Sequence, residues 1–147
     1  MPGATKTRLS KAALANVEGF NSGIRTLVSK LAEIYPDDAM VYRIRKRINL
    51  ALDVDPLFIV NITGPQLLRY SEKIYAKDFT FFVANDYDAE LKESVDAGRM
   101  EAAAYLIPKV KESAVALPED ERKKYMEVIV DMLDNYIDFV AERHGIA

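Results

Sequence analysis

The chain has 147 residues, no cysteine and one histidine, and half of its residues are apolar. A chain of this length buries roughly 70% of the surface that its unfolded form exposes, so it can build one hydrophobic core without disulfides or structural metals. The lack of cysteine excludes disulfides, thiolate metal sites and cysteine nucleophiles. His144 alone cannot supply the imidazoles of most zinc or di-iron sites, so we expect neither a metal nor a cofactor.

Charge is distributed unevenly along the chain. Residues 1–47 carry nine basic and four acidic side chains, whereas residues 48–147 carry eleven basic and nineteen acidic ones. Such polarity can orient a partner or bring an acidic surface against a basic one. Apolar runs such as Leu57–Val60 are far shorter than the roughly 20 residues of a membrane-spanning helix, which predicts no membrane insertion.

Residues 1–10 are predicted to form a flexible basic tail that precedes a single helical domain over residues 11–147. Lys6 and Arg8 are not followed by the apolar segment of a secretory signal. We therefore expect an intracellular protein that is not secreted.

Apolar residues at spacings of three and four predict two amphipathic helices in the first third of the chain. Pro36 ends the first helix, because the residue before a proline is pushed out of the helical region. Asp37 and Asp38 then cap the second helix. The two predicted buried stripes are Val17, Phe20, Ile24, Leu27, Val28, Leu31, Ile34 and Tyr35, and then Met40, Val41, Ile44, Ile48, Ala51 and Leu52.

The middle of the chain contains several helix breakers. Asp55-Pro56 predicts a helix start, and Gly64-Pro65 predicts an interruption before the helix continues from Gln66 to Lys77. The aromatic run Phe79–Val83 is too short for a helix of ordinary length and is predicted to plug the core. The acidic segment Asn85–Gly98 is predicted to be a surface connection with some helical turn.

Two further helices are predicted near the C-terminus. The first begins at Arg99 or Met100, and Pro108 is expected to bend or break it. The second begins after Pro118 with carboxylates in its first turn and ends at Gly145. Its predicted buried face consists of Tyr125, Ile129, Met132, Leu133, Tyr136, Ile137 and Val140. The sequence thus predicts an all-α, single-domain bundle of five or six helices, of which one or more is kinked at a proline.

One dense basic run, Arg43-Ile44-Arg45-Lys46-Arg47, is the candidate interaction surface. Arg43, Arg45, Lys46 and Arg47 could neutralise phosphates together with the basic tail. The simpler interpretation is an ordinary solvated helix face, because Ile44 belongs to the buried stripe. A sequence pI near 5.3 also lies well below the range typical of nucleic-acid-binding domains.

The sequence contains no recognisable catalytic or ligand-binding motif. Asp86–Glu90 has the alternating carboxylates that begin a calcium loop, but Leu91 replaces the required glycine and Ala97 the required glutamate. No nucleophile elbow, phosphate-binding loop or dinucleotide fingerprint is present. We therefore predict no catalytic, cofactor-binding or metal-binding residues.

Five segments share a recurring order of helix breakers and aromatic residues: Tyr35–Asp38, Asp55–Phe58, Tyr70–Ile74, Asp78–Phe82 and Leu117–Met126. This layout resembles that of small helical proteins from large nucleocytoplasmic DNA viruses, including those of algae. The resemblance covers about two-thirds of the chain, although this chain lacks the tryptophan often found in the last part of that layout. It implies a viral accessory or particle-associated protein, which would be virion-associated or cytoplasmic, and assigns no catalytic residue.

The sequence favours a non-enzymatic helical module that binds an unidentified protein partner or has a structural role. The alternative is a nucleic-acid-associated protein that uses the basic N-terminal part, including Arg43–Arg47, and steep salt dependence would mark it. An enzyme with paired carboxylates inside the bundle is the least favoured class, because no two carboxylates fall on a predicted buried stripe.

Overall fold

A computed structural model describes residues 9–85 and 97–143, with side chains for residues 9–85 and 104–142. These residues form seven helices and no strand, which confirms the all-α class; two short helices, α4 and α5, bring the number above the five or six predicted. The helices are α1 (Lys11–Ile34), α2 (Ala39–Val54), α3 (Leu57–Arg69), α4 (Ser71–Tyr75), α5 (Phe79–Ala84), α7 (Ala97–Ala116) and α8 (Glu119–Arg143).

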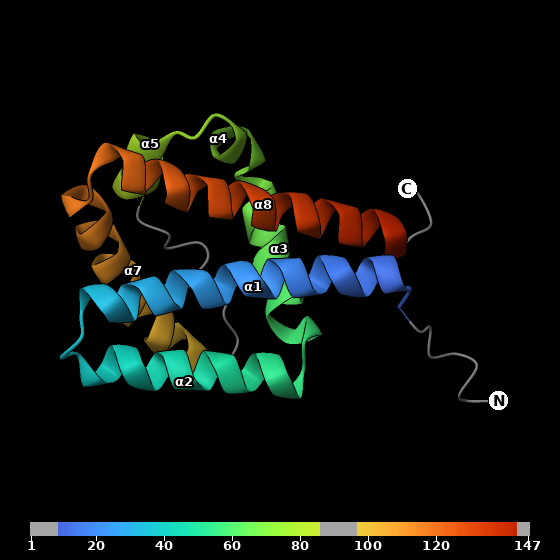
Figure 1. Ribbon diagram of the computed structural model, residues 1–147, viewed down its shortest axis with the longest axis horizontal. Helices are drawn as coiled ribbons and strands as arrows, with labels where there is room; N and C mark the ends of the chain where they lie inside the picture. Colours follow the sequence, from blue (N-terminus) through green and yellow to red (C-terminus); the bar gives the residue numbers. More distant parts are fainter. Residues whose placement is uncertain (1–8, 86–96, 144–147) are drawn as a thin grey trace.

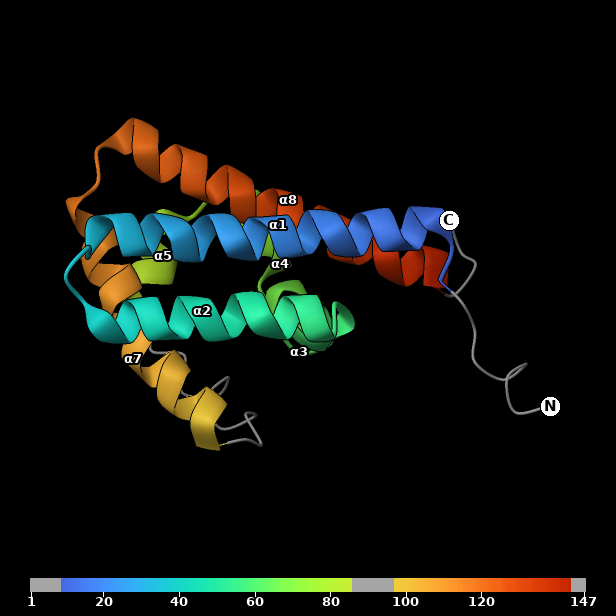
Figure 2. The ribbon, with the colours of Figure 1, turned by 60° about the horizontal axis from the view of Figure 1, so that its bottom comes forward.

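The two longest helices, α1 and α8, pack along each other and form the centre of the bundle (Figure 1). Helix α2 packs on α1, which lies between α2 and α8 in Figure 1, whereas the turned view shows that α8 crosses α1 (Figure 2). Helix α3 runs across the bundle and contacts α1, α2 and α8. None of the described helices is long and apolar enough to cross a membrane.

The hydrophobic core has two parts. The larger part lies between α1, α3 and α8, and the smaller part lies between α1 and α2, where Tyr105 and Leu106 of α7 close it. The buried members of the larger part are Ala13, Val17, Phe20, Val60, Met132 and Phe139. Those of the smaller part are Leu31, Ala32 and Val41.

Helices α1 and α2 both begin with a side-chain cap. The Ser10 hydroxyl accepts a hydrogen bond from the Ala13 amide, so α1 begins where the predicted tail ends. The Asp38 carboxylate accepts hydrogen bonds from the amides of Met40 and Val41, as predicted for an N-cap of α2. Residues 1–8 of the predicted tail and the predicted stop at Gly145 lie outside the described residues.

The predicted break at Gly64-Pro65 is wrong, because α3 continues through both residues and ends only at Arg69. Pro65 is exposed, and so is Asn61, whose carbonyl loses its helical partner and can bind water instead. Gly64 is buried, and a Cβ atom at this position would overlap the ring of Tyr136 in α8. The residue therefore serves the packing of α3 against α8.

Helix α7 also differs from its prediction. It begins at Ala97 and runs without a break through Pro108, which is exposed. Of the bend or break predicted at Pro108, the break is wrong, since the exposed side of a helix tolerates the unpaired carbonyl that a proline leaves.

The aromatic run is not a core plug. Residues 79–84 form the short helix α5, whose start is capped by Asp78 through the Phe81 amide, and none of its residues is fully buried. The rings of Phe81 and Phe82 instead pack against Tyr70, with centroids 5.8 and 6.4 Å from the Tyr70 ring. This cluster lies at the edge of the bundle, where α5 packs on α7 and the Arg122 guanidinium of α8 lies 4.9 Å from the centre of the Phe79 ring.

The predicted buried face of α8 is only partly right. Met132 and Leu133 are fully buried, but Ile137 is 37% exposed, while Met126 and Phe139 are buried and were not predicted. Ile137 lies at the edge of the buried face, where burial depends on which neighbouring helix covers that edge rather than on helical period.

Replacement of Leu133 by alanine should lower the free energy of unfolding by about 2–5 kcal/mol, because shortening a fully buried side chain leaves a cavity in the core. The matched substitution Ile137→Ala should lower it by only about 1 kcal/mol. Chemical denaturation of the two variants measures both values. Equal losses would contradict the orientation of α8.

Gly64→Ala should lower the free energy of unfolding by about 1–3 kcal/mol, because the new methyl group overlaps the Tyr136 ring. Gly19→Ala is the control, since its methyl group would lie 2.7 Å from the amide nitrogen of Asn135, at the movable end of that side chain. We expect Gly19→Ala to be neutral or to stabilise by up to about 1 kcal/mol, because alanine favours helix. Thermal unfolding compares the two.

Candidate functional site

The predicted basic residues lie on α2. Arg43, Lys46 and Arg47 are exposed, Arg45 is half-buried, and Ile44 is buried against the rest of the bundle, as predicted. Among the residues with described side chains, no carboxylate forms an ion pair with any of the four cations. The positive charge of α2 is therefore not neutralised within this part of the chain.

Large apolar side chains share the exposed side of α2 with these cations. Tyr42, Leu50 and Val54 are 46%, 62% and 76% exposed, and they lie on one line of the helix with Lys46, since the four positions are spaced by four residues. Sequence reasoning missed these apolar residues, although their spacing of four was visible. We call Tyr42, Arg43, Lys46, Arg47, Leu50 and Val54 the α2 outer face.

The C-terminal half of α2 is attached to α1 by polar contacts. The guanidinium of Arg25 in α1 donates hydrogen bonds to Asn49 at 3.0 Å and to Asp53 at 2.8 Å. Arg25 is thus paired with a carboxylate, whereas the cations of the α2 outer face have no such partner among the described side chains. These contacts hold the side of α2 that faces α1 and leave the outer face uncovered.

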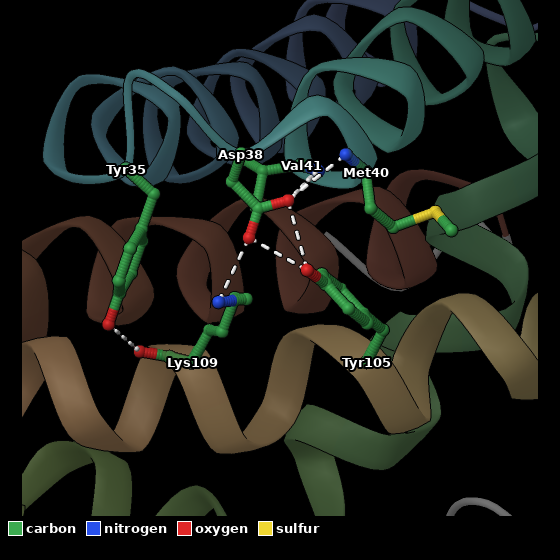
Figure 3. Close-up of polar contacts among 6 residues, drawn as sticks. All are labelled: Tyr35, Asp38, Met40, Val41, Tyr105 and Lys109. Atoms are coloured by element: carbon green, nitrogen blue, oxygen red, sulfur yellow. Dashed lines mark hydrogen bonds and ion pairs between the residues drawn. The ribbon is translucent and has the colours of Figure 1, made fainter.

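A polar cluster attaches α7 to the start of α2 (Figure 3). The Tyr105 hydroxyl donates to the Asp38 carboxylate, with distances of 2.9 and 2.7 Å to its two oxygens. Lys109 Nζ lies 2.9 Å from Asp38 Oδ2 and 4.5 Å from the centre of the Tyr35 ring. Asp38 therefore accepts from two backbone amides of α2 and from two side chains of α7 at once.

The charges of this cluster stabilise one another. Hydrogen bonds from Lys109 and Tyr105 lower the pKa of Asp38 to about 2. The same contacts raise the pKa of Tyr105 and that of Lys109, because each donates to the Asp38 carboxylate. All three groups are thereby held in their ordinary charge states at neutral pH, so none of them is suited to proton transfer there. The arrangement is that of a fixed link between helices.

Sequence reasoning identified Asp38 only as a cap and did not assign Tyr105 or Lys109. These residues lie 67 and 71 positions further along the chain, so no local pattern connects them to Asp38. Their meeting depends on how α7 crosses the turn between α1 and α2.

The groove between α1 and the first half of α8 is lined by charges that compensate one another. Lys30 lies 3.7 Å from Glu33 and 3.9 Å from Glu121, which in turn lies 3.5 Å from Lys124. Burial, with Glu121 and Glu33 nearby, raises the pKa of Tyr125 to about 12. The groove thus differs from the α2 outer face, whose cations form no ion pair with any carboxylate that the structure describes.

No group of three histidine or acidic side chains that could hold a metal ion occurs within the described residues. The acidic segment considered as a calcium loop, Asp86–Glu90, and the single histidine, His144, both lie outside them.

Comparisons with known proteins give one similarity to report. The chain is 26% identical over 121 residues to an uncharacterised protein of African swine fever virus, and the aligned region covers 82% of this chain and 88% of the relative. No family model matches the chain, and no solved structure matches it either. The similarity makes a link to large DNA viruses plausible, but it gives no support to the algal type of virus.

The Asp38 link should make stability depend on pH. Asp38→Asn keeps an oxygen that can cap α2 but removes the negative charge, so the variant should melt a few degrees below the wild type near neutral pH. Because folding lowers the pKa of Asp38 from 3.8 to about 2, the charge stabilises fully above 3.8 and this contribution is lost as the pH falls toward 2.

Melting temperatures of the wild type and Asp38→Asn across the acidic range, followed by circular dichroism, test this expectation. The difference between them should shrink steadily as the pH falls. Asp37→Asn removes the same charge from the exposed neighbouring position and serves as the control. A difference for Asp38→Asn that does not change with pH would contradict the ionic link.

Proposed function

We propose that this protein is a non-enzymatic helical module that binds an acidic, partly apolar segment of another protein through the α2 outer face. The observation that carries this proposal is the exposure of Arg43, Lys46 and Arg47 without a carboxylate partner in the described structure, next to exposed Tyr42 and Leu50. The similarity to a protein of African swine fever virus supports a viral accessory or particle-associated setting for this module.

The composition of the face fits a protein partner. Tyrosine and arginine are enriched where proteins bind one another, because each combines a large contact area with directed hydrogen bonding. Leu50 and Val54 are exposed, so they contribute favourable free energy to binding only when apolar atoms of a partner cover them. The three cations favour carboxylates at the same contact and set the orientation of the partner.

The α2 outer face is also held in place before binding. The Asp38 link fixes the first turn of α2, and the contacts of Arg25 fix its C-terminal half. A rigid helix loses less conformational freedom when it binds than a mobile segment does. The face therefore has the preorganisation that favours specific recognition.

A nucleic-acid-associated role is the second candidate, and the density of basic residues in Arg43–Arg47 favours it. Phosphates would engage the cations but would leave Leu50 and Val54 exposed. The two candidates therefore differ in how much the apolar half of the α2 outer face contributes to binding.

Two synthetic helical peptides separate these candidates. One repeats glutamate with leucine on the same helix face, and the other has serine in place of leucine. Because burial of Tyr42 and Leu50 adds to the ionic attraction, we expect the leucine peptide to bind roughly tenfold more tightly than the serine peptide at moderate salt. Fluorescence anisotropy of labelled peptides, with labelled duplex DNA in parallel, measures all three affinities.

The double variant Arg43→Glu/Arg47→Glu should lose binding of the leucine peptide. Lys11→Glu/Lys77→Glu is the matched control, because it makes the same change in net charge at exposed positions outside α2 and should bind as the wild type does. Tighter binding of DNA than of either peptide, with steep loss on added salt, would favour the nucleic-acid candidate instead.

A further inference from the structure

We infer that the α2 outer face binds the acidic outer side of α8 in a second copy of this chain, so that the protein associates with itself head to tail. This inference rests on the proposed function, because it names the acidic, partly apolar segment that the α2 outer face accepts. It requires a surface of that chemistry elsewhere on the molecule, and α8 carries one.

The C-terminal half of α8 exposes three carboxylates, Asp131, Asp134 and Asp138, within about two helical turns. Ile137, between them in sequence, is 37% exposed. The hydroxyl of exposed Tyr75, in α4, donates a hydrogen bond to Asp134 at 2.6 Å and places an aromatic ring beside the carboxylates. We call Tyr75, Asp131, Asp134, Ile137 and Asp138 the α8 acidic face.

The two faces complement each other in spacing as well as in charge. Arg43 and Arg47 are four residues apart in α2, as Asp134 and Asp138 are in α8, so both pairs are separated by a rise of about 6 Å along their helices. Tyr75 offers its ring to an arginine, since guanidinium groups favour aromatic faces. Ile137 offers apolar surface to Leu50 or Tyr42.

The fold prevents one molecule from joining its own two faces. Helices α2 and α8 both pack on α1, and each turns buried residues toward the core that it shares with α1. The exposed residues of the α2 outer face and of the α8 acidic face point away from these cores, so the two faces do not meet within one molecule. When the α2 outer face of one copy binds the α8 acidic face of another, one face stays free at each end of the pair. Further copies can therefore add to form a chain or close into a ring.

Electrostatics makes this association sensitive to salt. A single exposed ion pair contributes little, and ions screen it, so the contact depends on several pairs acting together with the apolar residues. Self-association should therefore be strongest at low ionic strength and increase with protein concentration.

Analytical ultracentrifugation of the full chain at about 50 mM and about 500 mM salt tests the inference. At low salt the weight-average mass of the wild type should rise with concentration above that of the 16.6 kDa monomer, and at high salt it should fall toward the monomer. Arg43→Glu/Arg47→Glu should remain monomeric at low salt. Asp131→Lys/Asp138→Lys should do the same, and it leaves the hydrogen bond between Tyr75 and Asp134 in place.

The decisive sample is an equal mixture of these two variants. One has acidic residues on both faces and the other has basic residues on both, so association should return in the mixture although neither variant associates alone. Lys11→Glu/Lys77→Glu controls for net charge and should associate as the wild type does. Circular dichroism melts confirm that each variant is folded.

The outcomes separate this inference from the proposed function. A wild type that stays monomeric at low salt, or a mixture that does not recover association, would overturn self-association. If the wild type still binds the leucine peptide in that case, the proposed function stands with a different partner. A wild type that neither binds the leucine peptide nor associates with itself would overturn the proposed function and this inference together.

Discussion

The close packing of α1 against α8 is the contact on which the other helices depend. Gly23 of α1 faces Met132 of α8, and a Cβ atom at Gly23 would lie 2.7 Å from the sulfur of Met132. The short distance lets Val17 and Phe20 reach full burial beside α8. Since most of the stability of a helix in a protein comes from the packing of its apolar face, this shared core provides the surface on which α2 and α3 pack.

Helix α2 is attached to this core in a different way. Its buried side is narrow, with Val41, Ile44 and Leu52 as its only fully buried residues, so polar links at its two ends add to its positioning. An ion pair between Asp38 and Lys109 links its first turn to α7, and hydrogen bonds from Arg25 link its last turns to α1. A helix held along one side and at both ends keeps its outer face uncovered.

The sequence was sufficient for features that depend on nearby residues. Helical period predicted the buried stripes of α1 and α2, and residue type predicted Asp38 as an N-cap. It failed where the answer depends on a distant neighbour. Whether Pro65 breaks a helix depends on whether that side of the helix faces water. The need for glycine at position 64 follows only from the Tyr136 ring of α8, which packs against it. The candidate site was found by its charges, while its apolar half was missed because exposure is decided by packing.

The exposed residues of the α2 outer face contribute little to the stability of the fold, so stability does not account for their chemistry. An isolated exposed leucine is common on protein surfaces, but Leu50 and Val54 are the most exposed large apolar side chains described and stand on the same helix line as Tyr42. Stability does not require apolar residues at these positions, because they bury little surface within the chain. Substitutions there are therefore expected to leave the bundle folded, whereas substitutions at Asp38 or Gly64 act on the contacts between helices.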